Sequence, residues 1–194
     1  MPPEDKTVFK LSTHPDKEKE AAIYLGPSPY IESRHPKIVK LAKDAVEGKE
    51  GWDKVEAIYD KVCDTLQFKE GDLKGALKAL TDGTGHCEEY SALFIAMCRA
   101  VDIPARTVWV PGHCYSEFYM VDDAGKGYWF PVQSAGTKSF GGIPETRPIL
   151  QKGDNFHDPD RPKDHLRYVS EFLKGATNKG SGKPQVHFIR EEEK

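Results

Sequence analysis

The sequence has no long hydrophobic segment and no marked excess of charge of either sign. Of its 194 residues, 28 are Lys or Arg and 31 are Asp or Glu, which gives a formal net charge of -3 at pH 7. No apolar run approaches the roughly 18 to 20 residues that a membrane-spanning helix needs, and the start lacks the apolar stretch of a signal peptide. The basic residues are scattered along the chain, so neither nucleic acid nor a membrane is an expected partner.

Cysteine is also scarce. The four cysteines are Cys63, Cys87, Cys98 and Cys114. Their irregular spacing in a chain of this length does not suggest a disulfide scaffold, so we expect free thiols. This composition predicts either a cytoplasmic protein or a secreted or periplasmic protein whose signal has been removed, and it leaves the oligomeric state open.

Helical periodicity governs the first half of the chain. Apolar residues follow the i, i+3, i+4, i+7 spacing over residues 38–46, between a proline and a glycine, and again over residues 55–66. Cys63 completes the second apolar stripe, so we interpret it as a small buried hydrophobic residue. A short third helix is predicted around residues 76–80.

A buried helix followed by strands is predicted next. Residues 91–100 are apolar nearly all the way round, which is typical of a helix inside the protein. Three β-rich runs follow at residues 106–110, 115–121 and 128–132, with a hairpin loop at 122–125. The order of elements predicts an α+β domain in which an antiparallel sheet packs on the buried helix.

The triplet Gly-His-Cys occurs twice, ending at Cys87 and at Cys114. Two His-Cys pairs fit either a zinc site or a thiol catalyst. Neighbours in a strand point to opposite faces, so only one of His113 and Cys114 is expected to face a given site. His86 and Cys87 are separated by about 100° around a helix axis, which hinders joint ligation. Zinc is therefore the weaker alternative, and we expect no metal and no cofactor.

Cys87 stands where a glycine-rich loop meets the buried helix. Unpaired N–H groups at a helix start favour a thiolate, and the Cys87 N–H is also placed to bind an oxyanion. Cys98 is expected in the core. His113 is the candidate base, although a lone histidine near a strand is more often structural, and spacing alone does not decide between these roles.

Three blocks of the sequence resemble the transglutaminase-like superfamily. The family pattern is a loop "G-x-C", a buried helix and "R-A-x-G-I-P-A-R", which residues 83–106 match. The second block, "H-A-W-x-E-x-Y", is matched by residues 113–119, and the third, "G-W-x-x-x-D-P", by residues 127–134. The resemblance implies a papain-like fold with Cys87 as nucleophile and His113 as base.

The third block departs from the family pattern. Where the family usually has an aspartate that orients the histidine, this chain has Gln133. An amide oxygen accepts the Nδ1–H of an imidazole but supports an imidazolium less well than a carboxylate does. A smaller departure is Asp102, where the family favours a glycine at the helix end.

The resemblance implies a cysteine-dependent amide-bond enzyme, a peptidase, amidase or acyl transferase, that acts on a peptide or protein amide. The alternative is a weak or inactive module that binds a peptide or protein. From Gln133 alone, both readings stay open. By the same resemblance, His86 and Cys114 are expected to be replaceable.

The resemblance covers roughly residues 25–175, which we expect to form one domain. Three segments are therefore expected: a lead at 1–24 with a candidate strand at 8–11, the domain at 25–175, and a linker-like tail at 176–194 with a candidate strand at 186–189. A further helix is predicted at 165–173. The acidic loop 154–160 lacks the calcium-binding pattern "D-x-[DN]-x-[DN]-G", so it is expected to be a proline-rich turn.

Overall fold

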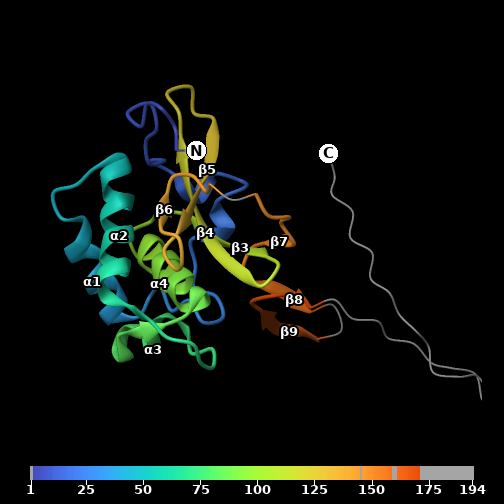
Figure 1. Ribbon diagram of the computed structural model, residues 1–194. Helices are drawn as coiled ribbons and strands as arrows, with labels where there is room; N and C mark the ends of the chain where they lie inside the picture. Colours follow the sequence, from blue (N-terminus) through green and yellow to red (C-terminus); the bar gives the residue numbers. More distant parts are fainter. Residues whose placement is uncertain (1, 145, 159–160, 171–194) are drawn as a thin grey trace, which may run out of the picture.

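The computed structural model describes residues 2–144, 146–158 and 161–170 and has the expected α+β architecture (Figure 1). The helical elements come mostly first and the main strands follow. The helical elements are η1 (Pro15–Lys17), η2 (Ala22–Tyr24), α1 (Pro36–Val46), α2 (Gly51–Thr65), α3 (Gly75–Asp82) and α4 (Cys87–Ala100). The strands are β1 (Gln67–Phe68), β2 (Thr84–Gly85), β3 (Ala105–Val110), β4 (His113–Val121), β5 (Gly127–Gln133), β6 (Ser139–Phe140), β7 (Gln151–Lys152), β8 (Phe156–Asp158) and β9 (Arg161–Leu166).

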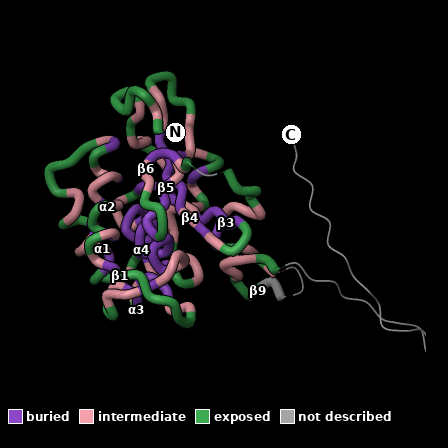
Figure 2. Tube along the Cα trace, viewed as in Figure 1, coloured by how far each residue is buried: buried purple, intermediate pink, exposed green. Residues whose placement is uncertain are grey.

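Helix α4 is the centre of the packing. It contacts α1, α2 and α3 as well as strands β3 and β4. Figure 2 shows buried residues concentrated along α4 and the strands beside it. Leu93, Phe94 and Met97 are fully buried, and each such side chain contributes about 1.5–3 kcal/mol by leaving water. The prediction of a buried helix, made from its all-round apolar pattern, is thereby confirmed.

The main sheet is antiparallel, with strand order β6-β5-β4-β3-β7. A two-residue turn joins β3 to β4, since Val110 pairs with His113, and β4 pairs in turn with β5. Phe118 and Met120 of β4 are fully buried, and Ser116 Oγ donates to Ser91 O of α4 at 3.4 Å. This face of β4 packs on α4, and the sheet brings the starts of α4 and β4 together.

Helix α4 ends at a residue with unusual backbone geometry. Asp102 has a φ of 61°, in the left-handed region that favours glycine. The glycine that the family pattern has at this position therefore suits the backbone, and the departure concerns the helix end only.

The last described segment differs from the sequence prediction. Residues 161–166 form β9, which pairs with β8, and residues 165–170 are not helical, in contrast to the predicted helix at 165–173, whose last three residues lie outside the described residues. Asp154, expected in a turn, is 1% exposed and forms an ion pair with Arg99. Asp154 is held by a partner 55 residues away in the sequence, which a local pattern does not reveal, whereas β8 and β9 form a short hairpin.

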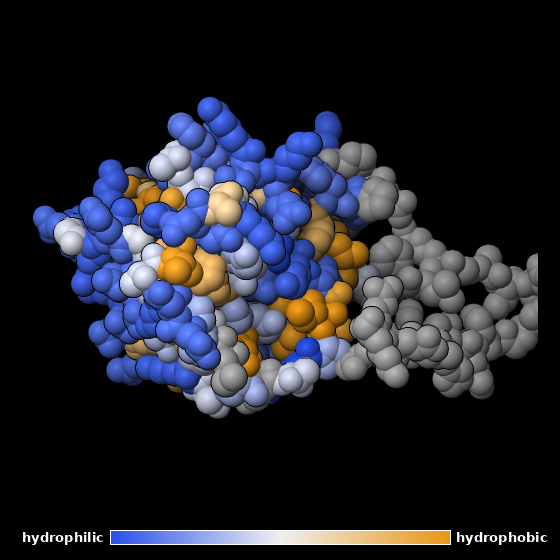
Figure 3. All heavy atoms as spheres, turned by 90° about the horizontal axis from the view of Figure 1, so that it is seen from above, coloured by the Kyte–Doolittle hydropathy of each residue, from blue (hydrophilic) through white to orange (hydrophobic). Residues whose placement is uncertain are grey.

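The N-terminal segment has a single bridge, between Lys10 and Val121, at the position of the candidate strand 8–11. The candidate strand at 186–189 lies outside the described residues. Hydrophilic side chains cover most of the face seen in Figure 3, with smaller hydrophobic areas between them. Among the described residues, none of the helices has the length and apolar character needed to cross a membrane.

Candidate active site

Cys87 is the first residue of α4, and a local hydrogen-bond network fixes its position. His86 is the N-cap, and its Nδ1 accepts a bond of 3.2 Å from the N–H of Glu88. Glu89 Oε2 accepts a bond of 3.0 Å from the N–H of His86, which completes a capping box. His86 therefore has a structural role at the start of the helix that carries Cys87.

Glu89 also ties the preceding loop to the helix. Its side chain is buried, and Oε1 accepts a bond of 3.0 Å from the N–H of Lys74. A Cβ at Gly85 would lie 2.5 Å from the Cβ of Glu89. The loop can therefore approach Glu89 this closely only with glycine at position 85.

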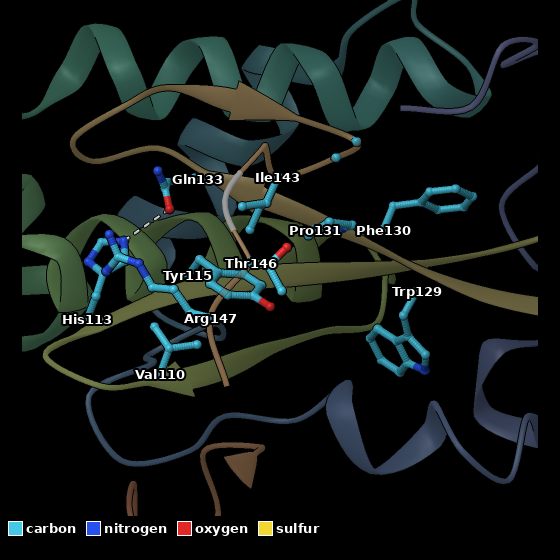
Figure 4. A pocket seen from close by; sticks show the side chains of 12 residues that line it. Val110, His113, Tyr115, Trp129, Phe130, Pro131, Gln133, Ile143, Thr146 and Arg147 are labelled. Atoms are coloured by element: carbon cyan, nitrogen blue, oxygen red, sulfur yellow. Dashed lines mark hydrogen bonds between the residues drawn. The ribbon is translucent and has the colours of Figure 1, made fainter. Parts of the chain in front are cut away.

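His113 and Gln133 come from neighbouring strands and face one another (Figure 4). The imidazole Nε2 of His113 lies 3.2 Å from Gln133 Oε1. The amide is oriented by a second bond, because Gln133 Nε2 donates to Thr137 O at 2.7 Å. The contact uses Nε2 in place of the expected Nδ1, which leaves Nδ1 as the ring nitrogen available to a thiol.

The thiol of Cys87 lies beside both Cys114 and His113. The interaction with Cys114 has the largest effect in holding the pKa of Cys87 well below its usual value, and the interaction with His113 acts in the same direction against the effect of burial. The same contact with Cys87 is the main cause that raises the pKa of His113. A thiolate beside an imidazolium is the charge state that this geometry favours.

Cys114 of β4 packs against α4 beside Cys87. Its Sγ is 3.8 Å from Ser91 Oγ, and its side chain is buried. The contact with Cys87 raises the pKa of Cys114 well above its usual value. Of the two sulfurs, Cys87 carries the negative charge, because it is half-buried at a helix start and contacts His113.

The contact of Cys114 with Cys87 corrects one sequence-based interpretation. Strand alternation predicted that only one of His113 and Cys114 reaches a given site, yet both contact the Cys87 thiol. They are the first two residues of β4, directly after the tight turn from β3. Alternation separates neighbours across the body of a sheet and constrains them less at a strand end.

The other two cysteines lie apart from this group. Cys98 is fully buried in α4, as expected. Cys63 is half-buried rather than buried, and its thiol donates to Ser134 O at 3.8 Å. Within residues 2–144, 146–158 and 161–170, no three or more His, Cys, Asp or Glu side chains are grouped so as to hold a metal ion.

A pocket of about 460 Å³ opens beside His113 and Gln133 (Figure 4). Most of its remaining lining is aromatic or apolar, with a threonine and an arginine at the loop that follows β6. These lining residues are Val110, Tyr115, Trp129, Phe130, Pro131, Gly141, Gly142, Ile143, Thr146 and Arg147. The pocket therefore offers room for an apolar group next to the imidazole.

Comparison with known proteins agrees with the fold. Residues 39–134 match the model of the transglutaminase-like superfamily. The chain belongs to the transglutaminase-like superfamily. The matched region begins in α1 and ends one residue after Gln133, so it contains the whole thiol, imidazole and amide group.

Solved structures with the same fold include a protein from Cytophaga hutchinsonii described as a candidate cysteine protease. It is 25% identical with a TM-score of 0.59, and the match covers 74% of this chain and 50% of that protein. The chain thus spans about half the length of that relative. None of the curated proteins is similar enough in sequence to count as a match.

Two more distant structures were also found. A candidate protease from Parabacteroides distasonis is 16% identical with a TM-score of 0.41, over 57% of this chain and 28% of that one. A TGase is 14% identical with a TM-score of 0.38, over 68% of this chain and 41% of that one.

Within the transglutaminase-like pattern, sequence reasoning missed the parts played by Cys114 and Glu89. The signal for Glu89 was its place three residues after the N-cap, which is the spacing of a capping box. Cys114 offered no such signal, because the pattern drew attention to His113 beside it. Only the packing of β4 on α4 brings the sulfur of Cys114 to Cys87.

Proposed function

We propose that this transglutaminase-like protein is a cysteine-dependent amide-bond enzyme. In this proposal Cys87 is the nucleophile, His113 the general acid and base, and Gln133 orients His113. The observation that carries it is the unbroken chain of contacts from the Cys87 thiol through the His113 imidazole to the Gln133 amide. A nucleophile in contact with a base that a third group orients is the arrangement that thiol catalysis requires.

The proposed reaction follows from the charge state of the site. The Cys87 thiolate attacks the amide carbonyl, and the backbone N–H of Cys87 at the helix start donates to the oxyanion. His113 then gives its proton to the departing amine, and a thioester remains on Cys87. Water, deprotonated by the now neutral His113, attacks the thioester and releases the acid and the free thiolate.

Hydrolysis of a peptide or protein is the outcome that we propose. The relative from Cytophaga hutchinsonii is described as a candidate cysteine protease, which supports a peptide substrate. The pocket beside His113 lies next to the group that protonates the amine, so it suits an apolar side chain on the leaving side of the peptide bond.

Turnover of a peptide and amide library by the purified protein tests the proposal. The wild-type protein is expected to hydrolyse members of the library, and Cys87→Ala is expected to abolish this turnover. Cys63→Ser is the matched control, because Cys63 lies outside the thiol and imidazole group, and it is expected to keep turnover. Peptide binding without any turnover by the wild type would contradict the proposal and favour a binding module, the reading that the missing aspartate favours.

Gln133→Ala is expected to lower turnover about tenfold, the equivalent of one lost hydrogen bond of about 1–1.5 kcal/mol in the transition state. The bond from Gln133 also raises the pKa of His113. Without it, His113 loses its proton at lower pH, so the basic limb of the pH–rate profile is expected to move to lower pH. A profile that moves to higher pH, or does not move, would show that Gln133 does not orient the working imidazole.

A further inference from the structure

The two sulfurs in the site lie next to one another but differ in exposure and in the element that carries them. Cys87 is half-buried at the start of α4, whereas Cys114 is 2% exposed on β4. Cys114 Sγ lies 3.8 Å from Ser91 Oγ, and the two thiols are close enough for each to shift the pKa of the other. Ser91 is one helical turn beyond Cys87, so α4 presents Cys87 and Ser91 on the same face toward Cys114. The thiol of Cys114 is thus held against the sulfur of Cys87.

A thiolate that reaches solvent is the form of cysteine that peroxides oxidise, and a second thiol next to it determines the final product. With no partner, a sulfenic acid proceeds to sulfinic and sulfonic acids, which are irreversible under ordinary conditions. With a partner thiol in contact, it condenses to a disulfide, which thiols can reduce. Cys114 is the cysteine that lies beside Cys87 in this way.

We propose that Cys87 and Cys114 form a hydroperoxide-sensitive pair that closes into a reversible disulfide. Here Cys87 is the oxidised residue and Cys114 is the resolving residue. The consequence for activity, loss of the nucleophile until the disulfide is reduced, rests on the proposed function. Formation of the disulfide itself does not.

The chemistry balances with a hydroperoxide as the oxidant. The Cys87 thiolate attacks one oxygen of the peroxide, the O–O bond breaks, and the leaving oxygen takes a proton, so Cys87 becomes a sulfenic acid. The sulfur of Cys114 then attacks the sulfur of Cys87. An S–S bond forms, the S–OH bond breaks, and the leaving hydroxide combines with the proton of Cys114 as water.

The first step also prepares the second. The main cause that keeps the proton on Cys114 is its contact with Cys87. A sulfenic acid at Cys87 is neutral, so the negative charge next to Cys114 disappears once the peroxide has reacted. His113 contacts the same sulfur and is a base within the group. Loss of the proton from Cys114 therefore becomes easier at the moment when its thiolate is needed.

Treatment of the purified wild-type protein with hydrogen peroxide tests the pair. We expect the mass of the chain to fall by two hydrogen atoms, a crosslinked Cys87–Cys114 peptide in non-reducing digests, and loss of iodoacetamide labelling at Cys87. Dithiothreitol is expected to restore the labelling. Cys63→Ser, the matched control, is expected to give the same crosslink. Cys114→Ser, checked for folding by circular dichroism, is expected to add oxygen at Cys87 up to the sulfinic acid.

Sulfinic acid at Cys87 in the wild-type protein, with the thiol of Cys114 still free to alkylate after denaturation, would overturn the proposal. That result leaves the proposed function standing if Cys87→Ala still abolishes turnover. A crosslink in a protein that turns over no amide supports the pair and contradicts the enzyme. The two failures are therefore distinguishable in the same preparations.

Discussion

A His113→Ala variant is expected to turn over amides about 10²- to 10⁴-fold more slowly than the wild type, the range for loss of a general acid and base. The imidazole has two jobs in the proposed reaction, since it stabilises the thiolate and later protonates the amine. Alanine can neither stabilise the thiolate nor protonate the amine, whereas the contact between Cys114 and Cys87 remains. Steady-state turnover of a hydrolysed peptide, measured with equal amounts of folded protein, checks this expectation.

The same variant separates thiolate stabilisation from proton transfer. In the wild type the pKa of Cys87 is depressed, so its thiolate, and its labelling by iodoacetamide, persist as the pH falls and are lost only below the depressed pKa. Without His113 the pKa of Cys87 moves up, so labelling at pH 6 is expected to slow while labelling at pH 9 stays the same.

His14→Ala is the matched control for both measurements, because His14 is exposed and lies outside the site. It is expected to keep the turnover and the labelling profile of the wild type. An unchanged labelling profile in His113→Ala would show that His113 does not stabilise the thiolate, and would leave it at most a role in proton transfer.

The elements that sequence predicted well are those fixed by local patterns. The apolar spacings over residues 38–46 and 55–66 lie within α1 and α2, apart from the last residue of the second spacing. Such apolar residues are buried together only when a helix places them on one face against the core. The strands β3, β4 and β5 followed from β-rich runs between turn signals. The same reasoning brought Cys87, His113 and Gln133 forward as site candidates.

Most features that sequence did not predict depend on contacts between distant segments. The exception is β9, which forms a short hairpin with the neighbouring strand β8, and nothing in the composition of residues 161–166 marks that pairing. Arg167 forms an ion pair with Glu88, in the first turn of α4. Cys114 belongs to the same class, since its meeting with Cys87 depends on how β4 crosses α4. The periodicity of a sequence describes one helix or strand at a time and does not predict contacts between elements.

Asp154→Ala is expected to lower the free energy of unfolding by about 3–5 kcal/mol, the usual cost of leaving one partner of a buried ion pair alone. Arg99 Nη2 donates to both carboxylate oxygens of Asp154 at 2.9 Å, and the two side chains are 1% and 2% exposed. Asp154 also accepts bonds from the N–H of Thr107 and from Ser28 Oγ. Urea unfolding followed by circular dichroism measures the loss.

Asp123→Ala is the matched control, because it removes the same side chain from an exposed pair. Asp123 and Lys10 are 2.6 Å apart, but their side chains are 67% and 65% exposed, and such surface pairs contribute about 0–1 kcal/mol. Equal losses in the two variants would contradict the idea that burial of the ion pair sets the cost.

An Arg99→Met and Asp154→Leu double variant is expected to recover part of the loss caused by Asp154→Ala alone. The alanine variant leaves a guanidinium buried without its counter-charge, whereas the double variant removes both charges and fills much of the space with apolar groups. Recovery is expected to be incomplete, because Arg99 also donates to Ala105 O and to Gly26 O. Those carbonyls, in β3 and in the segment before α1, lose a partner in the double variant. Arg99 thus joins the end of α4 to β3 and to the segment before α1, which no local sequence pattern connects. The part of the free energy of unfolding that the double variant does not recover measures the contribution of these bonds.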